Sequence, residues 1–238
     1  MRHIVWDWNG TLLDDLAVVV AAVNETLATV GRRPITIEEY GAQYTRPVLL
    51  FYERLLGRAI EESEWRGFDE AFHASYRRRV DSASLATDAI EAIMAVHRAG
   101  LSQSLLSMYW HDELVPQVSR FDLSRFLVRI DGLRGTPGDR KQAYLEQHLR
   151  AVSLDLSSEI PPSEILVIGD ALDDADAASA LGLNCVLYNG GAHPVKQLAT
   201  AGVPVVGSLM EALEVGGVPL PGRRGRLACR ARQGRVKR

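Results

Sequence analysis

The sequence predicts an α/β fold: a Rossmann-like, doubly wound parallel sheet with an inserted α-helical cap. Short apolar segments at residues 4–6 and 165–168 have the length and composition of buried strands. After residue 87 such segments alternate with helical patterns of about a dozen residues, which is typical of a parallel sheet. Residues 34–84, in contrast, keep a helical character without an obvious strand of that sheet, which indicates a separate helical unit.

The first helix is predicted directly after the first strand. Apolar residues recur at spacings of three and four from Leu16 onward, and Gly31 ends the pattern. The segment that follows is rich in aromatic and charged residues. We therefore expect a core made of residues 1–14 and 85–214, with a helical cap of residues 15–84 inserted into it.

The second half of the chain continues the alternation. Asp88, with Glu91 three residues later, predicts a capping box at the start of a helix that Gly100 ends. Strands are then expected at residues 101–106, 127–130, 165–168, 185–188 and 203–206, and helices at residues 140–150, 174–181 and after Ser208, which Glu211 helps to cap.

Composition indicates a soluble protein of moderate size. Of the 238 residues, 47% are hydrophobic and 24% are charged, close to ordinary globular usage. The longest apolar run, residues 16–23, is too short to span a bilayer, and two cysteines imply no disulfide framework. The first strand begins almost at Met1, which leaves no room for a signal peptide, so the expected location is the cytoplasm.

Charge separates the C-terminal segment from the rest. Residues 215–238 carry a balance of +8, and residues 1–214 carry −11. The segment is also rich in Gly, Pro and Arg, which predicts a basic, disordered tail. Binding of this tail to nucleic acid is a weaker hypothesis than a solvated extension.

Four chemically active side chains are expected at one edge of the sheet. Asp7, Ser107, Lys141 and Asp170 all lie at the carboxyl ends of predicted strands or in the loops that follow. Those ends gather along one edge of a parallel sheet, where ligands bind. A carboxylate nucleophile, a hydroxyl donor, a lysine and a second carboxylate for a divalent cation together indicate phosphoryl transfer.

The same residues carry a resemblance to the haloacid dehalogenase superfamily, and within it to the phosphoglycolate-phosphatase-like branch. Residues 7–12 match the first family motif, Asp-x-Asp-Gly-Thr-Leu, except at its third position. Ser107 and Lys141 fit the second and third motifs. Residues 169–182 align with the fourth, Gly-Asp-Thr-x-x-Asp-x-x-Ala-Ala-x-x-Ala-Gly, and the helical insertion lies where the family has its cap.

The resemblance implies a magnesium-dependent phosphatase of small phosphorylated metabolites. Asp7 would form the aspartyl-phosphate, and Mg²⁺ would be held by Asp7, the backbone carbonyl of Asn9, and Asp170, with Asp174 in support. Ser107 would bind the phosphoryl oxygens together with Lys141.

Three further positions are candidates for substrate binding. Backbone N–H groups near Gly10 and Thr11 are placed to hold the transferring oxygens, and Arg46, after an aromatic stretch of the cap, is placed to reach a substrate anion. An ordinary solvated arginine is the competing interpretation of Arg46.

Asn9 is the departure from the family pattern. The family residue at this position protonates the leaving group and later activates water, and a carboxamide can do neither, so acid–base assistance of roughly 10²–10⁴-fold would be missing. Three interpretations stay open. The substrate has a good leaving group, such as an aryl or acyl phosphate; another residue, such as His111 or a cap side chain, supplies the proton; or the protein binds a phosphorylated ligand and turns it over slowly.

Other chemistries fit less well. Dehalogenase relatives lack the paired acidic residues of the fourth motif, and phosphonate-cleaving relatives need a cap lysine, whereas the three lysines of this chain are Lys141, Lys196 and Lys237. A sugar-phosphate mutase would need the missing acid–base residue. No zinc spacing and no P-loop sequence occurs. The main alternative to a phosphatase is therefore a catalytically weak ligand-binding or regulatory protein on the same fold.

Overall fold

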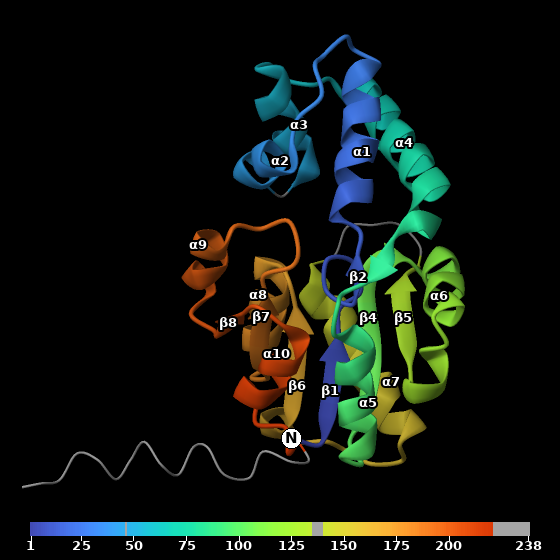
Figure 1. The fold of residues 1–238 in the computed structure, drawn as a ribbon, viewed down its shortest axis with the longest axis vertical. Helices are drawn as coiled ribbons and strands as arrows, with labels where there is room; N and C mark the ends of the chain where they lie inside the picture. Colours follow the sequence, from blue (N-terminus) through green and yellow to red (C-terminus); the bar gives the residue numbers. More distant parts are fainter. Residues whose placement is uncertain (46, 135–139, 221–238) are drawn as a thin grey trace, which may run out of the picture.

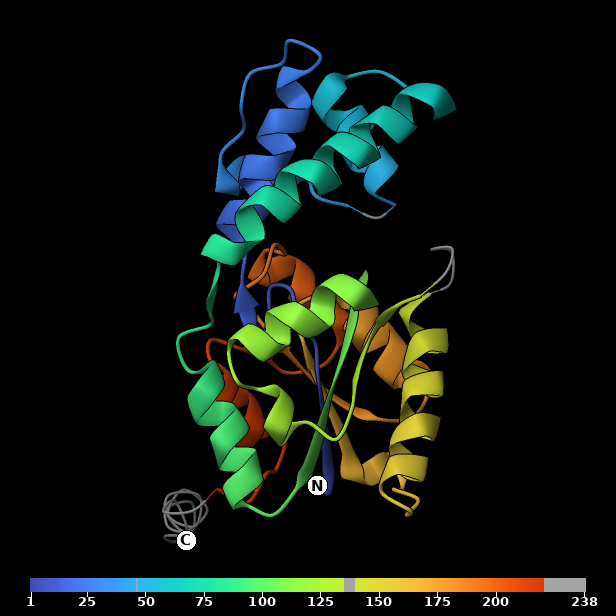
Figure 2. The same cartoon turned by 90° about the vertical axis from the view of Figure 1, so that its right-hand side faces the viewer.

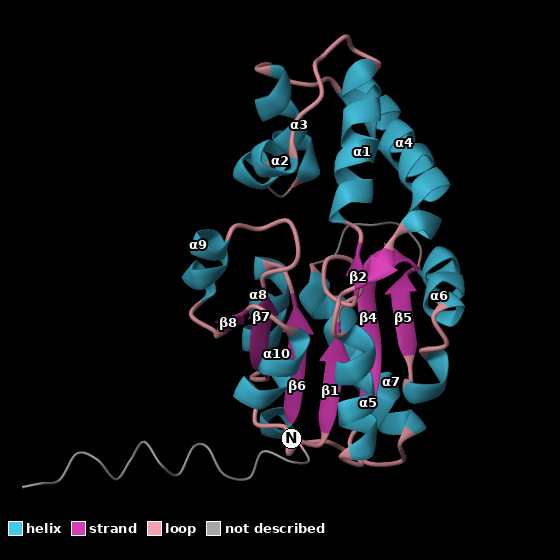
Figure 3. Cartoon of the chain, in the orientation of Figure 1, coloured by secondary structure: helices cyan, strands magenta, loops and turns pink. Residues whose placement is uncertain are grey.

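The core of the molecule is a six-stranded, entirely parallel sheet (Figures 1 and 3). The computed structural model describes residues 1–45, 47–134 and 140–220. The spatial order of the strands is β5-β4-β1-β6-β7-β8. Their bounds are β1 His3–Trp6, β4 Ser102–Trp110, β5 Ile130–Leu133, β6 Ile165–Gly169, β7 Asn184–Tyr188 and β8 Val205–Val206.

Helices cover both faces of the sheet, which confirms the doubly wound α/β fold. One face is covered by α5 (Ala89–Arg98), α6 (His111–Arg120) and α10 (Leu209–Val215), and the other by α7 (Lys141–Asp155) and α8 (Leu172–Ala180). A short helix, α9 (Val195–Leu198), follows β7. Single 3-10 turns occur at η1 (Val80–Ser82), η2 (Ser124–Phe126), η3 (Pro162–Glu164) and η4 (Ala199–Ala201).

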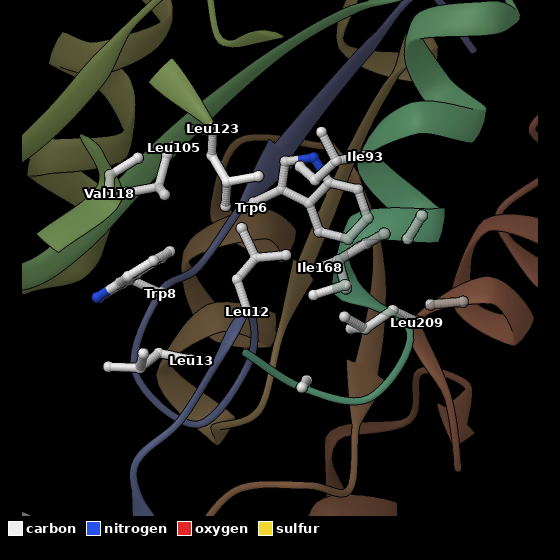
Figure 4. Packing of buried hydrophobic residues seen from close by; sticks show 14 of the residues in the cluster. Trp6, Trp8, Leu12, Leu13, Ile93, Leu105, Val118, Leu123, Ile168 and Leu209 are labelled. Atoms are coloured by element: carbon white, nitrogen blue, oxygen red, sulfur yellow. The ribbon is translucent and has the colours of Figure 1, made fainter. Parts of the chain in front are cut away.

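The alternation of side chains along β1 builds both halves of the core. Ile4 and Trp6 pack in the cluster under α5, α6 and α10, and Val5 packs in the cluster under α7 and α8. Figure 4 shows Trp6 among the leucines and isoleucines of the first cluster. The indole nitrogen of the buried Trp6 donates to Oε1 of Gln103 over 2.9 Å, so its polar atom is satisfied inside the core.

Four helices form a layer above the carboxyl edge of the sheet (Figures 1 and 2). They are α1 (Leu16–Ala28), α2 (Ile37–Gln43), α3 (Val48–Leu56) and α4 (Glu62–Arg79), and they enclose an apolar cluster of their own. Where the chain enters and leaves this layer, β2 (Leu13–Asp14) and β3 (Ser84–Leu85) pair antiparallel, a small sheet that the sequence did not suggest. The cap boundaries stay a prediction.

Two predicted helix caps have different outcomes. The hydroxyl of Ser208 accepts from the backbone nitrogen of Glu211 over 3.1 Å, as expected. The capping box at Asp88 is wrong, because Asp88 makes no cap hydrogen bond in α5. Its Oδ2 accepts instead from the backbone nitrogen of Met210, over 2.9 Å, so it satisfies a donor in the first turn of α10.

The C-terminal segment begins to depart from the core later than predicted. Helix α10 extends to Val215, and Val218 is 6% exposed and belongs to the main apolar cluster. A disordered tail from residue 215 is therefore wrong for its first residues, while residues 221–238 lie outside the described part of the chain. Among the described residues, no helix combines the length and apolarity needed to cross a membrane. The cytoplasmic location stays a prediction.

A buried polar network joins β1, β4 and α7. Nε2 of His3 and Nε2 of His148 lie 2.8 and 2.7 Å from the hydroxyl oxygen of Ser104, and Nδ1 of His148 lies 2.7 Å from Oδ2 of Asp131. One hydroxyl has one proton, so Ser104 donates to one imidazole and accepts from the other. Burial, with a smaller repulsion from His148, lowers the pKa of His3 to about 3, and this imidazole is therefore neutral in the folded protein.

Candidate active site

Asp7 lies at the point where the strand order reverses. It directly follows β1, which is flanked by β4 on one side and β6 on the other, and its backbone nitrogen donates to the carbonyl of Ile168 over 2.9 Å. Ligands of open α/β sheets bind outside the carboxyl ends of the strands at such a point. The residue is 7% exposed, so this carboxylate faces a nearly closed site.

Three carboxylates and one ammonium group meet there. Lys141, the first residue of α7, donates from Nζ to Oδ1 of Asp7 over 2.6 Å and forms a second ion pair with Asp174. Asp170, directly after β6, completes the cluster: Asp7, Asp170 and Asp174 each offer an oxygen, and these oxygens lie within 4.8 Å of one another. The structure thus brings together side chains that the sequence places more than 130 residues apart.

The charges of this cluster do not balance. Burial raises the pKa of Asp7 and Asp170, and it raises the pKa of Asp174 to about 7. Burial would lower the pKa of Lys141, but Asp174 and Asp7 outweigh it and raise that pKa. Three carboxylates against one ammonium leave two negative charges uncompensated when all are ionised, which a divalent cation would neutralise.

The surroundings of Asp170 fit a cation site with oxygen ligands. A Cβ on Gly10 would lie 2.5 Å from Oδ2 of Asp170, and a Cβ on Gly191 would lie 1.7 Å from it, so both glycines leave space that the carboxylate occupies. The buried hydroxyl of Thr11 is 3.3 Å from Oδ1 of Asp170 and 3.5 Å from Oδ2 of Asp7 and donates to them. Carboxylate oxygens are the ligands that hard divalent cations prefer.

The sequence predicts Ser107 directly after a strand, but the structure places it inside β4. The ladder between β4 and β5 shifts register between Leu106 and Trp110, and Ser107 falls in that irregular stretch. Its hydroxyl accepts from the backbone nitrogen of Tyr109 over 3.1 Å and donates to Oδ1 of Asn9 over 3.3 Å. The irregularity therefore turns a strand residue toward the site.

The carboxamide of Asn9 is held by residues from outside the motif. Its Nδ2 donates to Oδ2 of Asp15 over 2.8 Å and to the hydroxyl of Tyr76 over 2.7 Å. Tyr76, on cap helix α4, donates in turn to Oδ2 of Asp15 over 2.6 Å, and the backbone nitrogen of Gly10 donates to Oδ1 of Asp15 over 3.0 Å. Asp15, 3% exposed, thus accepts three hydrogen bonds, which fix three side chains and the backbone of Gly10 together.

A cavity of about 180 Å³ joins these residues to the cap. The polar and charged residues of its lining include Asp7, Asn9, Asp15, Ser107, Lys141, Asp170, Asp173 and Asp174. Apolar and aromatic residues of the cap and core and one histidine also line it: Leu16, Val19, Tyr40, Tyr44, Met108, Tyr109 and His193. A phosphoryl group at the acidic cluster would therefore share the cavity with these apolar and aromatic side chains.

Some expected contributors lie elsewhere. Gly10 lines the cavity, but its backbone nitrogen already donates to Asp15 and to the carbonyl of Leu13, at 3.0 and 2.9 Å. Thr11 is fully buried and is not part of the cavity lining. His111 accepts from the backbone nitrogen of Gly132 over 3.2 Å and does not line the cavity. Arg46 lies outside the described residues.

Asp15, Tyr76 and His193 were missed from the sequence. Asp15 carried a signal, because a carboxylate six residues after an unexpected Asn is a natural partner for its amide. Tyr76 and His193 come from the cap and from the loop after β7, and their sequence neighbourhoods do not distinguish them from ordinary core residues.

Comparison with known proteins agrees with this geometry. The family model of the haloacid dehalogenase-like hydrolases matches residues 1–182. The chain is 23% identical over 206 residues to a phosphoglycolate phosphatase of Pseudomonas fluorescens, covering 83% of this chain and 73% of that one. It is 26% identical over 208 residues to a phosphoglycolate phosphatase of Cereibacter sphaeroides, covering 85% and 93%.

The fold agrees as well. A haloacid dehalogenase-like family hydrolase from Streptococcus pneumoniae superimposes with a TM-score of 0.73 at 16% identity, covering 90% of this chain and 97% of the other. The match of the family model over most of the sequence shows that the chain belongs to the haloacid dehalogenase-like hydrolases, among which it resembles the phosphoglycolate-phosphatase branch.

Proposed function

We propose that this hydrolase is a magnesium-dependent phosphatase of small phosphorylated metabolites that works through an aspartyl-phosphate at Asp7. The observation that carries the proposal is the cluster at the switch point, where Lys141 Nζ lies 2.6 Å from Oδ1 of Asp7 and Asp170 and Asp174 complete an acidic pocket. The names of the curated relatives, phosphoglycolate phosphatases, support the reaction class.

In this proposal Mg²⁺ is held by Asp7, Asp170 and the backbone carbonyl of Asn9, with Asp174 in support. The cation would neutralise phosphate charge so that a carboxylate can approach phosphorus. Lys141 offsets the remaining charge, opposes the rise in the pKa of Asp7 that burial causes, and orients its carboxylate. When substrate binds, the hydroxyl of Ser107 breaks its hydrogen bond to Asn9 and donates to a phosphoryl oxygen instead. Ser107 already lines the cavity.

The proposed reaction has no residue at position 9 that can protonate the leaving group. Asn9 has no proton to transfer, and its amide hydrogens are donated to Asp15 and Tyr76. This observation favours the second candidate, a ligand-binding or regulatory protein with weak turnover. The two candidates make different predictions for phosphate release.

The deciding experiment is Mg²⁺-dependent phosphate release from an aryl phosphate and an acyl phosphate, with Asp7→Ala as the control for contaminating activity. Release that disappears in Asp7→Ala and on chelation supports the phosphatase, and a phosphoryl adduct on Asp7, located by peptide mass spectrometry, supports the intermediate. Equal release by the parent and Asp7→Ala would contradict the proposal and favour the binding protein.

A further inference from the structure

We propose that the substrates of this site are phosphate monoesters of acidic hydroxyl groups, aryl phosphates above all, whose leaving group departs as an anion without help from an acid. This inference rests on the proposed phosphatase and names its substrate class. Three features carry it: the occupied carboxamide of Asn9, the hydrogen bonds of the two side chains behind it, and the apolar and aromatic lining of the cavity.

The carboxamide of Asn9 has no free hydrogen-bonding capacity toward an ester oxygen. Its two amide hydrogens are directed at Asp15 and Tyr76, at 2.8 and 2.7 Å, and its Oδ1 receives the hydroxyl of Ser107 at 3.3 Å. An amide also transfers no proton at neutral pH. When Ser107 turns to a phosphoryl oxygen, Asn9 gains a free acceptor but still no donor.

The groups behind Asn9 do not replace the missing acid. The carboxylate of Asp15 accepts hydrogen bonds from Asn9, Tyr76 and the backbone nitrogen of Gly10, so three donors already meet at its oxygens. The hydroxyl of Tyr76 directs its proton at Asp15. Neither group holds a proton aimed at the cavity.

The apolar and aromatic lining of the cavity suits an aromatic ring. Tyr40 of α2 and Tyr44, which directly follows that helix, stack with centroids 5.2 Å apart, and the ring of His193 meets Tyr44 edge-on, also at 5.2 Å. Leu16 and Val19 of α1 line the same cavity. At about 180 Å³ the cavity is smaller than the pockets of drug-sized ligands, so a single ring fits its scale.

The two steps balance without an acid at the ester oxygen. A carboxylate oxygen of Asp7 forms a bond to phosphorus while the bond from phosphorus to the ester oxygen breaks, and the electron pair leaves with the aryloxide, which is later protonated by solvent. Water then attacks the phosphorus atom, the bond to Asp7 breaks, and the electron pair returns to the carboxylate. The proton of the water goes to solvent, and inorganic phosphate is released.

The test measures kcat/KM for a series of ring-substituted phenyl phosphates and for ethyl phosphate, at saturating Mg²⁺. We expect kcat/KM to fall by roughly tenfold for each unit of leaving-group pKa, because the leaving oxygen carries its full charge. Ethyl phosphate should be hydrolysed too slowly to separate from Asp7→Ala. A shallow dependence, or ethyl phosphate hydrolysed as well as phenyl phosphate, would overturn the inference and leave the phosphatase intact.

Failure of the proposed function has a different signature. If no ester of the series, including the most activated nitrophenyl ester, gives more product with the parent than with Asp7→Ala, both the phosphatase and the substrate class are refuted. The measurements on the ester series use only the parent protein and Asp7→Ala, so they do not depend on whether any other variant folds.

Two kinds of variant test whether the missing acid at position 9 causes the dependence of kcat/KM on leaving-group pKa. The exchange Asn9→Asp/Asp15→Asn keeps one carboxylate and one amide in contact but puts the acid toward the cavity, and we expect it to flatten the dependence on leaving-group pKa. Asp15→Asn and His193→Gln alone should leave the slope unchanged. A steeper slope in either single variant would identify that side chain as the proton donor and overturn the inference.

Discussion

Nδ2 of Asn9 donates to Oδ2 of Asp15 over 2.8 Å, and this contact makes the residues at the two positions depend on each other. An amide at position 9 satisfies the buried carboxylate of Asp15, which is 3% exposed. The hydroxyl of Tyr76 reaches both residues and links them to cap helix α4. The loop after β1 and the cap therefore share one hydrogen-bonded unit.

Asn9→Asp alone should destabilise the protein. It places a second carboxylate against Asp15 in a buried site, where two like charges cannot both ionise without penalty. We expect the free energy of unfolding at neutral pH to fall by about 1–3 kcal/mol. The penalty should fade as the pH is lowered and one carboxyl takes up a proton. Urea unfolding of Asn9→Asp, Asp15→Asn and the double variant checks this, because the double variant should recover most of the loss. Additive losses would show that the contact is not the cause.

Two tyrosine hydroxyls should differ in their effect on stability. Tyr76→Phe removes the group that donates to Asp15 and accepts from Asn9, and should lower the free energy of unfolding by about 1–2 kcal/mol. Tyr52, inside the cap, is equally buried, but its hydroxyl has no hydrogen-bond partner among the described residues. Tyr52→Phe should therefore be close to neutral in the same urea titrations. Equal losses in both variants would contradict this account of Tyr76.

Gly191→Ala should abolish the response to Mg²⁺. Its Cβ would lie 1.7 Å from Oδ2 of Asp170, so the carboxylate has to leave the cluster. We expect Mg²⁺ to raise the Tm of the parent protein, because a ligand of the folded state stabilises it, and to leave the Tm of Gly191→Ala unchanged. The matched control is Gly67→Ala in helix α4. Apart from its own helix backbone and chain neighbours, nothing described lies within 4 Å of the new methyl group, so the variant should gain up to about 1 kcal/mol of stability while keeping the Mg²⁺ shift. A full shift in Gly191→Ala would show that Asp170 is not a ligand.

His3 should make the protein less stable as the pH falls from about 6.5 towards 3. Its pKa is lowered to about 3 in the folded state, so the unfolded chain takes up a proton first. Through His3 alone, the free energy of unfolding falls by at most about 1.4 kcal/mol per pH unit. The carboxyl of Asp131, whose pKa is held at about 2 by His148 and Arg129 against burial, adds to the loss only below its ordinary value of 3.8.

The measurement is the difference in unfolding free energy between the parent and His3→Gln from pH 6.5 down to 4.5, in which the contributions of the active-site carboxylates cancel. The parent should lose stability relative to His3→Gln over this window. His97→Gln, on the exposed side of α5, is the control and should follow the parent. A parallel course of His3→Gln and the parent would refute the assignment.

The sequence predicts the sheet and the acidic cluster well, because both depend on local patterns. Strand β1 and the loop after β6 are short apolar segments followed by acidic residues, and a parallel sheet brings their ends together whatever the details between them. The position of Ser107 was less predictable, because the irregularity between β4 and β5 arises from pairing with another strand. Asp88 was misjudged since its carboxylate serves α10, more than 120 residues away in the chain.

The contacts of Asn9 depend on the arrangement of the cap. Tyr76 reaches Asn9 from a helix 67 residues later, and its orientation is set by the packing of α4 against α1. No pattern in the sequence around Tyr76 predicts its contact with Asn9. The contacts of Gly10 and Thr11 were not predictable for a similar reason: the backbone nitrogen of Gly10 donates to Asp15, and the hydroxyl of Thr11 donates to the carboxylates of the cluster.

The contact between Asn9 and Asp15 also constrains the order in which substitutions can accumulate in this lineage. A chain that acquires Asp at position 9 while Asp15 is present passes through a form with two adjacent buried carboxylates. A chain that first loses Asp15 passes through a form in which the amide of Asn9 keeps only its bond to Tyr76. Selection for stability therefore opposes the exchange of Asn9 for an acidic residue. It does so even though a single nucleotide change converts an Asn codon into an Asp codon.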